Sequence, residues 1–370
     1  MDSVTQFVLG GAVGAALLGP RIGARRAALI GGLYGTLPDL DTFVPAADPV
    51  SSFTTHRGPT HSLLVQALAT PLFAEPLVRL IADLRDKRIV TYLAVYLVFA
   101  THALIDAMTV YGTQLFWPVA PEPVGVGSIF IIDPLYTLPL LGVVMWALFV
   151  KGWGPRYKRW LQGALAVSTA YMAFTVVAQT WVEARAERLL AAKGIVPERT
   201  LAIPTPFNTL YWRTIAIDGE RYLNVYLPLF GDDKVTIYAH PRHPELAACL
   251  EGTPAYRTLA AFTDGYFRLE RDGDKIVFAD LRMGLTPNYT FRFALAEFTP
   301  DGARPLGQPT RERGPRSADG DYRWLFSGIA GDAGPRPIEA PAMVALNELA
   351  PLGSGRMTLA CGPAESDIRG

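Results

Sequence analysis

The sequence predicts a polytopic α-helical membrane domain of about six helices, followed by a small extracytoplasmic domain that is β-rich or α+β. Three observations predict this fold class. Long apolar stretches dominate the chain from Phe7 to Val182, whereas the chain from Glu183 onward is charged, rich in proline and glycine, and too polar to span a bilayer. Basic residues gather in alternate loops of the apolar part. Alternating polar and apolar residues, separated by turn sequences, recur in the polar part.

Four apolar stretches are close to the roughly 17–25 residues that a membrane-spanning helix needs. They are Thr60–Leu80, Ile89–Val110, Ser128–Val150 and Leu161–Val182. Two shorter stretches, Phe7–Pro20 and Ala27–Pro38, suit a tightly packed helical hairpin. Each contains a pair of glycines at a spacing that lets membrane helices approach closely. These glycines are Gly10, Gly14, Gly31 and Gly35, and the alternative is that they reflect only the ordinary composition of membrane helices.

The charges of the loops predict the orientation of these helices. Basic residues follow the first, third and fifth helices, namely Arg21, Arg25 and Arg26, then Arg85, Lys87 and Arg88, then Lys151, Arg156, Lys158 and Arg159. The alternate loops, at about residues 38–59 and 111–127, contain only Arg57 as a basic residue. Because cytoplasmic loops are enriched in Lys and Arg, six helices with both termini outside fit the pattern. The first apolar stretch is not a standard cleavable signal, because its basic residues come after it.

We expect the membrane domain to cover residues 1–182 and the extracytoplasmic domain to cover residues 207–370, with a flexible tail after Met357. Residues 183–206 are expected to extend the last helix and then to form a proline-rich linker. The residues from Asp301 to Arg323 are predicted to form a loop. The predicted strands, several of them separated by hairpin turns, are Leu210–Ile217, Arg221–Leu227, Lys234–Ala239, Tyr266–Leu269, Lys275–Leu281 and Thr290–Glu297.

Composition limits the classes of partner. The 34 basic and 34 acidic residues balance to zero net charge, which gives no indication of a nucleic-acid partner. Cys249 and Cys361 do not make a disulfide framework. Outside the cytoplasm they could form one bridge, and a pair of free thiols is the alternative. His240 and His243 lie in a proline-rich stretch that indicates solvent exposure.

Six side chains of metal-ligand type lie in or beside the apolar stretches. They are Asp39, Asp41, His56, His61, His102 and Asp106. A neutral imidazole or a carboxylate in hydrocarbon costs several kcal/mol unless it has a partner. The predicted topology places all six at the outer face of the membrane, although helix order and charge bias do not depend on them. We therefore predict that these residues bind a metal ion.

The spacing of these residues suits a shared ion. His102 and Asp106 are four residues apart, so they share one face of a helix. The alternative for this pair is a hydrogen-bonded His–Asp contact packed between helices. Asp39 and Asp41 lie at a helix end, where capping of a short turn is the alternative and explains only Asp41.

The loop with two histidines also contains the basic residue of the outer loops. His56 and His61 flank a proline, which favours a turn or the first turn of a helix. Arg57 is predicted to act in catalysis by stabilising the charge of a phosphate-like group. A lipid headgroup anchor is the alternative for Arg57. Thr60 and Ser62 are expected to cap the helix or to hold a ligand in place rather than to attack substrate.

Asp133 is the second candidate catalytic residue, at the outer start of the fifth helix. An aspartate before Pro134 is also a normal helix N-cap, and a ligand or supporting role is the other interpretation. The His and Asp residues together are enough to hold one or two ions. Mixed imidazole and carboxylate sites suit Zn²⁺, with Mn²⁺ or Fe²⁺ as alternatives. Two ions about 3.5–4 Å apart are the usual arrangement for hydrolysing phosphate esters.

Three motifs resemble those of a known family: Leu37-Pro38-Asp39-Leu40-Asp41, His56-Arg57-Gly58-Pro59-Thr60-His61-Ser62, and His102-Ala-Leu-Ile-Asp106 through Thr109-Val-Tyr111-Gly112. Over residues 1–150 the chain resembles the LexA-regulated inner-membrane metal-dependent hydrolases of bacteria. Shorter motifs, Ile132-Asp133-Pro134, Pro206-Phe207-Asn208 and Tyr211-Trp212-Arg213, extend the likeness. The resemblance implies a multi-pass, metal-dependent hydrolase in the bacterial cytoplasmic membrane. The mixture of His and Asp is also similar in type to that of zinc-dependent phospholipase C.

The leading hypothesis is hydrolysis of a phosphoester, on a membrane lipid or a lipid-linked substrate, at the outer face of the membrane. The first alternative is a metal- or proton-coupled transporter, because intramembrane His and Asp often form ion paths. A transporter predicts polar residues continuing toward the cytoplasmic side, but Glu75 and Arg79 are expected to pair with each other. The second alternative is a non-catalytic membrane scaffold with a structural metal.

Overall fold

The computed structural model describes residues 1–150, 152–231, 235–300, 302–332, 334–344 and 361. These residues form two compact units. Unit 1 comprises Met1–Pro45, Thr55–Ala178 and Pro206–Asn208, and unit 2 comprises Ala46–Thr54, Gln179–Thr205 and Thr209–Gly370. The chain therefore passes between the units several times, including once on each side of residues 46–54.

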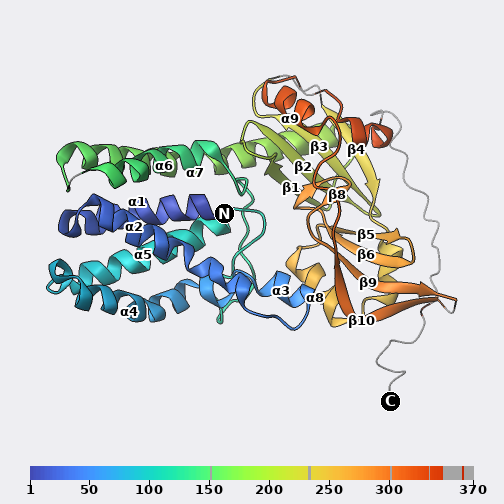
Figure 1. Cartoon of the computed structure of the whole chain (residues 1–370). Helices are drawn as coiled ribbons and strands as arrows, with labels where there is room; N and C mark the ends of the chain where they lie inside the picture. Colours follow the sequence, from blue (N-terminus) through green and yellow to red (C-terminus); the bar gives the residue numbers. More distant parts are fainter. Residues whose placement is uncertain (151, 232–234, 301, 333, 345–360, 362–370) are drawn as a thin grey trace, which may run out of the picture. The chain divides into compact units, whose positions relative to one another are not determined.

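Unit 1 is a bundle of helices that run alongside one another (Figure 1). Its helices are α1 Ser3–Ile22, α2 Ala24–Thr36, α4 Leu63–Leu80, α5 Arg88–Ala107, α6 Pro134–Phe149 and the first part of α7 Pro155–Ala191. Short 3₁₀ helices are η1 Pro38–Phe43, η2 Pro59–His61 and η3 Ala82–Leu84. Four of these helices, α1, α4, α5 and α7, are long and apolar enough to cross a membrane, and α6 is a shorter apolar helix. The predicted helical membrane domain is confirmed.

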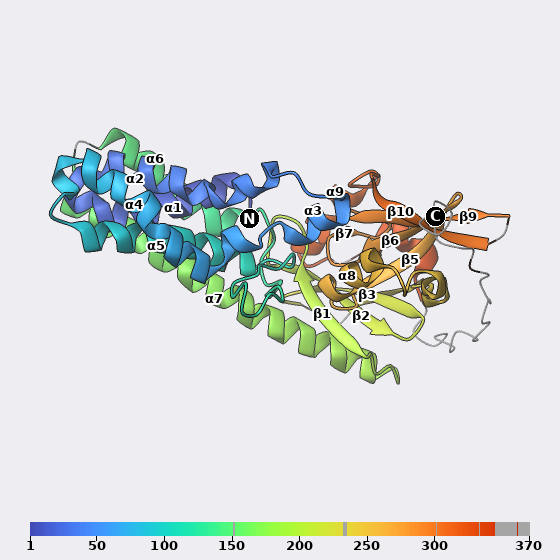
Figure 2. The same cartoon turned by 90° about the horizontal axis from the view of Figure 1, so that it is seen from below.

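The six predicted apolar stretches are all helical. The fifth begins later than expected, at Pro134, because Asp133 caps the helix and proline is favoured at the first helical position. The sixth continues to Ala191 without a break, as the predicted extension required (Figure 2). The expected pair of Glu75 and Arg79 also forms, with Nε of the arginine 2.9 Å from Oε1 of the glutamate.

Helices α1 and α2 form the predicted tight hairpin. A Cβ atom added at Gly14 would lie 2.7 Å from Cα of Gly31, and one added at Gly35 would lie 3.0 Å from Cα of Gly10. Both distances are too short for a side chain, so the two backbones touch through these glycines. The hairpin packs in a core of small and branched side chains from α1, α2 and α6, including Ala12, Ala28 and Val144.

Unit 2 is built mainly of antiparallel strands, which confirms the predicted β-rich domain. One sheet has the order β1-β2-β3-β4, with β1 Arg199–Pro204, β2 Tyr211–Asp218, β3 Arg221–Pro228 and β4 Thr236–Pro241. A second has the order β10-β9-β6-β5, with β5 Phe267–Asp272, β6 Lys275–Asp280, β9 Arg292–Thr299 and β10 Gly302–Glu312. A small third sheet pairs β7 Gly284–Leu285 with β8 Asn288–Tyr289. The remaining elements are α3 Pro49–Thr55, η4 Pro244–Cys249, α8 Pro254–Phe262, α9 Asp321–Ile329 and η5 Pro337–Ala342.

Two predicted irregular segments are wrong. The stretch 301–323, predicted to be a loop, contains β10 and the start of α9. Its prolines obscured the strand, which lies at the edge of its sheet, where a missing N–H is tolerated, and is irregular between Pro305 and Thr310. The predicted linker contains β1, because its register with β2 supplies an antiparallel partner.

The prediction of solvent exposure is wrong for His240, which is buried. Its Nε2 lies 2.9 Å from Oε1 of Glu339 and its ring stacks on Tyr222. His243 is half-exposed. Cys249 and Cys361 form a disulfide, which decides between the two alternatives for the cysteines. Apart from Cys361, the predicted flexible tail lies outside the described residues.

Candidate metal centre

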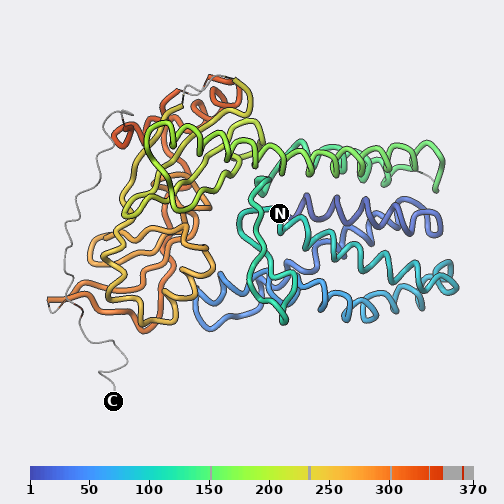
Figure 3. Tube along the Cα trace, turned by 180° about the vertical axis from the view of Figure 1, so that it is seen from behind, coloured from blue at the N-terminus to red at the C-terminus, as the bar shows by residue number. Residues whose placement is uncertain are grey.

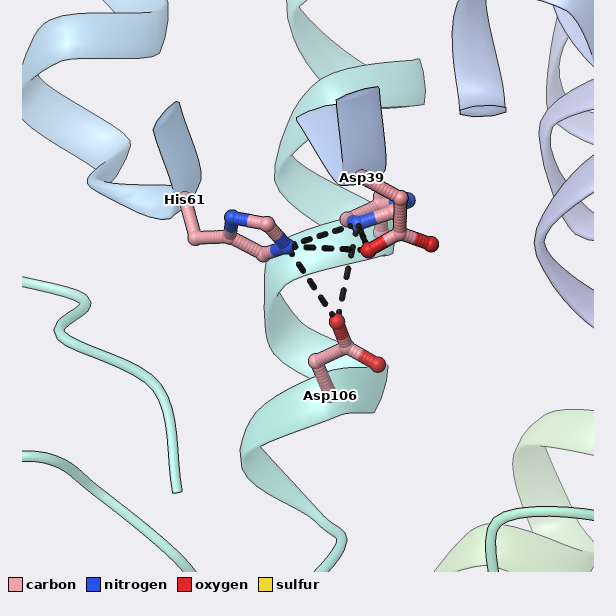
Figure 4. Close-up of side chains that lie close together, drawn as sticks. Asp39, His61 and Asp106 are labelled. Carbon is pink, nitrogen blue, oxygen red and sulfur yellow. Dashed lines mark hydrogen bonds and ion pairs between the residues drawn. The ribbon is translucent and has the colours of Figure 1, made fainter. Parts of the chain in front are cut away.

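Four side chains of unit 1 converge on one position in the bundle. They are Asp39, His61, His102 and Asp106, and one ligand atom from each lies within 4.8 Å of all the others. Figure 4 shows Asp39, His61 and Asp106 pointing toward one another. The two histidines and Asp106 are fully buried, and Asp39 is mostly buried. Sequence positions far apart in the chain thus meet, as the ligand motifs predicted.

The local sequence explains how each ligand reaches this position. Pro38 begins η1, so Asp39 leaves α2 in a tight turn. His61 is the last residue of η2, which Pro59 begins. His102 and Asp106 lie one turn apart near the end of α5 and project from the same face.

Both histidines use Nδ1 as a hydrogen-bond donor. Nδ1 of His102 lies 2.6 Å from the carbonyl oxygen of Gly35, and a carbonyl can only accept. The Thr60 hydroxyl donates to Oδ2 of Asp41 at 2.8 Å. It must therefore accept from Nδ1 of His61, which lies 2.9 Å away. In each neutral ring the lone pair is consequently on Nε2.

The two Nε2 atoms face each other, 3.0 Å apart. Each Nε2 atom also lies near two carboxylate oxygens, Oδ1 of Asp39 and Oδ2 of Asp106. Both oxygens are 3.4 Å from Nε2 of His61 and 3.5 Å from Nε2 of His102. Four electron-rich atoms this close repel one another unless a cation lies among them. Bonds of about 2.0–2.1 Å to a tetrahedral ion would place neighbouring ligand atoms about 3.3 Å apart. The donor set and its spacing therefore fit a metal ion.

A buried oxygen supports the same interpretation. Oδ2 of Asp106 makes no well-aligned hydrogen bond with the described residues, although Nε of Arg57 lies 3.2 Å away. Oδ1 of Asp106, in contrast, accepts from Nε2 of Gln6 at 3.0 Å and contacts the amino group of Met1. A buried carboxylate oxygen without a well-aligned donor is the atom that an ion would satisfy.

Neighbouring polar groups favour the ionised forms of Asp39 and His61. Burial opposes ionisation of Asp39, but hydrogen bonds with His102 and His61 outweigh it and lower the pKa of Asp39 below its ordinary value. Burial likewise opposes protonation of His61, but Asp106 and Asp39 outweigh it and raise the pKa of His61. Without a metal ion, His61 therefore binds a proton more readily than an ordinary histidine does.

Asp41 and His56 form a separate pair beside the four ligands. Nδ1 of His56 lies 2.7 Å from Oδ1 of Asp41. Oδ2 of Asp41 accepts from the backbone N–H of Arg57 at 3.2 Å and from the Thr60 hydroxyl. The carboxylate of Asp41 therefore orients His56 and, through Thr60, His61. Both residues, predicted as ligands, lie at the site but outside the group of four.

Arg57 is buried against the centre. Its Nε lies 3.2 Å from Oδ2 of Asp106, its Nη1 donates to the Thr109 hydroxyl at 2.9 Å, and its guanidinium lies over the ring of Tyr111. Its φ of 63° is in the left-handed region, which is costly for a residue with a side chain. The hydrogen bonds of Arg57 stabilise this strained turn and direct its guanidinium group into the bundle.

Asp133 lies in unit 1 but outside the group of four ligands. Its Oδ1 accepts from the backbone N–H groups of Leu135 and Tyr136, and its Oδ2 accepts from the Tyr171 hydroxyl at 2.9 Å. These are the contacts of a helix N-cap, one of its two predicted interpretations. Ser62 caps α4 as predicted, and it also donates to the carbonyl of Trp117. The loop between α5 and α6, which contains Trp117, runs across one end of the helices of unit 1 (Figure 3).

Comparison with protein families agrees with this picture of the helical unit. Residues 1–182 match the YdjM inner membrane protein family. This is the LexA-regulated inner-membrane family that the motifs resemble, and its description names a location and no activity. Comparisons with curated proteins and with solved structures found no match.

The region that matches the YdjM family contains site residues to which the sequence analysis gave no role. Gln6 was not singled out, and Thr109 and Tyr111 appeared only within a motif that carries the resemblance. Gln6 and Thr109 hold Asp106 and Arg57, and Tyr111 packs on both Arg57 and His56. A glutamine at the edge of an apolar stretch is a signal, because a buried amide needs a partner. Tyr111 carried no such signal, since an aromatic residue at a helix end is ordinary at a membrane interface.

Proposed function

We propose that this protein is a membrane-bound, metal-dependent hydrolase of a phosphoester, carried by a membrane lipid or a lipid-linked substrate, at the outer face of the inner membrane. One observation carries the proposal. Two histidines, each of which donates a hydrogen bond from Nδ1, direct their Nε2 atoms toward each other and toward two carboxylates. A structural polar cluster would pair donors with acceptors, whereas this one gathers acceptors around a common point.

The four ligands together suit a divalent ion, and Zn²⁺ is the first to test because it accepts imidazole and carboxylate together, with Mn²⁺ and Fe²⁺ next. A divalent ion at this site would supply Lewis-acid chemistry to a phosphoester oxygen. The described geometry groups the ligands about one position and pairs Asp41 with His56 separately, which favours one ion.

The other residues of the site have roles that follow from their contacts. His56 is oriented through Nδ1 by Asp41, and its half-buried ring leaves Nε2 for proton transfer. Arg57 supplies a fixed positive charge beside Asp106, where it would stabilise negative charge that develops on the substrate. Asp133, as the cap of α6, is proposed to act only by holding that helix in place.

The surroundings of the site support an amphiphilic substrate at the membrane. The family match and the apolar helices support an inner-membrane protein. Next to Asp39 and Asp41 on η1, the side chains of Leu40, Phe43 and Val44 are exposed. Exposed apolar side chains beside a polar site suit an amphiphilic substrate. The disulfide supports an extracytoplasmic position for unit 2, since disulfides persist in oxidising compartments.

The test is a metal-dependent hydrolysis assay on the full chain in detergent or proteoliposomes. Purified protein is stripped of metal, reloaded with Zn²⁺, Mn²⁺ or Fe²⁺, and assayed for phosphate or alcohol release from lipid phosphates, phospholipids and soluble phosphoesters. His61→Ala and Asp106→Asn are the site variants. His243→Ala, a half-exposed histidine of unit 2, is the matched control.

We expect hydrolysis that requires the metal, with loss of both metal and activity in the two site variants and neither in the control. Full metal stoichiometry in both site variants would overturn the metal centre. Bound metal without hydrolysis of any substrate class would overturn the hydrolase. Metal-dependent uptake into proteoliposomes, lost in His102→Ala, would support the transporter instead.

A further inference from the structure

A loop joins the two chain segments that contain the site residues of η1 and η2, and its central residues belong to the other unit. Asp39 and Asp41 precede the loop, and His56, Arg57 and His61 follow it. All five residues belong to unit 1, but residues 46–54 between them belong to unit 2. The chain thus leaves the unit of the metal centre and returns to it within a few residues of its ligands.

The base of this loop is closed by Asp41. Its carboxylate is bonded to Nδ1 of His56, to the backbone N–H of Arg57 and to the Thr60 hydroxyl. These bonds join the end of η1 to the start of η2. Residues 42–55 therefore form a closed loop whose two ends meet at the metal centre.

The tip of the loop is α3, a short helix with its own cap. Oδ1 of Asp48 accepts from the backbone N–H groups of Val50 and Ser51, at 2.8 and 3.0 Å. Phe53 on this helix is 5 % exposed. Its ring centroid lies 4.3 Å from that of Phe291, 4.8 Å from that of Phe262 and 5.3 Å from that of Phe293.

Phe53 therefore fills an aromatic socket formed by residues of α8, β9 and the chain just before β9, all in unit 2. Rings at these separations attract one another in addition to burying apolar area. Only Thr55 separates the part of the chain assigned to unit 2 from His56. Such a short connection transmits a restraint on α3 directly to the turn that places His56 and Arg57.

We propose that Phe53 is a positioning residue, by which the β-rich unit fixes the loop that carries His56, Arg57 and His61 and thereby sets the geometry of the metal centre. The inference rests on the metal centre and is independent of whether the bound ion hydrolyses a phosphoester. It assigns unit 2 a role in the chemistry of unit 1 through the chain itself.

The test uses Co²⁺ as a spectroscopic probe in the full-length protein in detergent, because its visible absorption reports ligand geometry. The variants are Phe53→Ala, Phe53→Leu as the conservative rescue, and Phe291→Ala, which removes the same contact from the socket side. The control is Trp324→Ala, a buried ring of α9 in unit 2 that packs on Tyr226 rather than on the socket. Protease resistance checks that each variant is folded.

We expect Phe53→Ala and Phe291→Ala to weaken Co²⁺ binding about tenfold and to shift its absorption bands, the size seen when supporting residues of a metal site are lost. Phe53→Leu and the control should stay within about twofold of wild type, because they keep the anchor. An unchanged spectrum and affinity in folded Phe53→Ala would overturn the proposal, as would an equal effect in the control.

Two further outcomes separate this proposal from the proposed function. A wild-type protein that binds no Co²⁺ would overturn the metal centre and the positioning role together. Normal Co²⁺ binding that responds to Phe53→Ala, in a protein that hydrolyses nothing, would support the positioning role and count only against the hydrolase.

Discussion

Arg57 and Asp106 face each other inside the helical bundle, with Nε of the arginine 3.2 Å from Oδ2 of the aspartate. Arg57 is 7 % exposed and Asp106 is fully buried. The same carboxylate oxygen is one of the four candidate ligand atoms. Arg57 neutralises this charge from one side, and an ion held by the four residues would neutralise it from the other. Each should therefore matter more when the other is absent.

The first prediction is that Arg57→Gln destabilises the metal-free protein more than the metal-loaded protein. Removing one partner of a buried ion pair costs about 3–5 kcal/mol, because the other charge is left without compensation. An ion on Asp106 supplies part of that compensation. Thermal unfolding in detergent, with and without Zn²⁺, should show a larger metal-induced rise of the midpoint in the variant than in wild type.

The control for this prediction is Arg79→Gln, whose arginine is 75 % exposed and pairs with Glu75. A surface pair of this kind contributes at most about 1 kcal/mol, so the control should behave as wild type with and without metal. Equal metal-induced stabilisation in Arg57→Gln and wild type would contradict the shared neutralisation of Asp106.

The second prediction distinguishes Asp39 from Asp41. Asp39→Asn removes a ligand charge, so the purified variant should contain little metal. Asp41→Asn leaves the four ligands in place but disturbs Thr60 and His61, so it should keep full stoichiometry with an affinity reduced about 10- to 100-fold. Metal analysis by mass spectrometry and competition with a chelator measure the two quantities. Loss of stoichiometry in both variants would make Asp41 a direct ligand.

The third prediction concerns the close approach of α1 and α2. A Cβ at Gly35 would lie 2.7 Å from the carbonyl oxygen of Gln6 and 3.0 Å from Cα of Gly10, so Gly35→Ala must push the two helices apart. Overpacking of this kind costs about 1–3 kcal/mol. Because the Gly35 carbonyl also accepts from Nδ1 of His102, metal affinity should fall together with stability.

Gly142→Ala provides the matched control, since a Cβ there meets no atom within 4 Å. Removing a glycine from a helix without a clash should leave the protein as stable as wild type or slightly more stable. Thermal unfolding and metal titration of both variants check the prediction. A Gly35→Ala protein with wild-type metal affinity would show that the hairpin spacing does not set the position of His102.

The four residues of the candidate metal centre could be predicted from the sequence because polar residues stand out in an apolar context. Asp39, His61, His102 and Asp106 had no ordinary reason to lie in or beside membrane helices, and the charges of the loops predicted that they share one face of the membrane. The sequence could not separate Asp41 and His56 from the ligands. Their residue types are the same, and the difference is which nitrogen or oxygen faces the centre, which depends on Thr60 and the backbone of Arg57.

The β-rich unit shows the other limit of prediction. Strands with alternating β-branched and aromatic residues, such as β2 and β3, were found almost to the residue. β10 was missed because Pro305 and Pro309 resemble loop residues, although an edge strand accepts them. The burial of His240 depends on Glu339, which is far away in the sequence. No local pattern around the histidine contains that partner.

The fourth prediction is that Cys249 and Cys361 are oxidised in cells. They close a loop with a sequence separation of 112, so the double Cys→Ser variant should be less stable by about 4–5 kcal/mol in the chain-entropy model. A maleimide–polyethylene glycol reagent added to freshly lysed cells should shift the wild-type band only after reduction, while Cys249→Ser should shift without it. Free thiols in the wild-type protein would argue against an extracytoplasmic unit 2.

The fifth prediction concerns the acid stability of the β-rich unit, which depends on Glu339. Burial opposes ionisation of this side chain, but hydrogen bonds with His240 and the charge of Arg336 outweigh it and lower its pKa to about 2 from an ordinary value of 4.5. A group with a lowered pKa in the folded state contributes stability above its unfolded pKa and loses that contribution as the pH falls to its folded pKa. The contribution should therefore be complete above about pH 4.5 and absent below about pH 2.

The difference between the two pKa values corresponds to roughly 3 kcal/mol. Glu339→Gln cannot ionise, so its deficit relative to wild type should be largest near neutral pH and should shrink between about pH 4.5 and pH 2. Thermal unfolding across this range, followed by tryptophan fluorescence because Trp324 packs beside Arg336, measures the deficit. Glu220→Gln, which changes an exposed glutamate of the same unit, is the matched control. A deficit in Glu339→Gln that is constant over this range would mean that the folded and unfolded proteins bind the same number of protons there, and that His240 and Arg336 do not lower the pKa of Glu339.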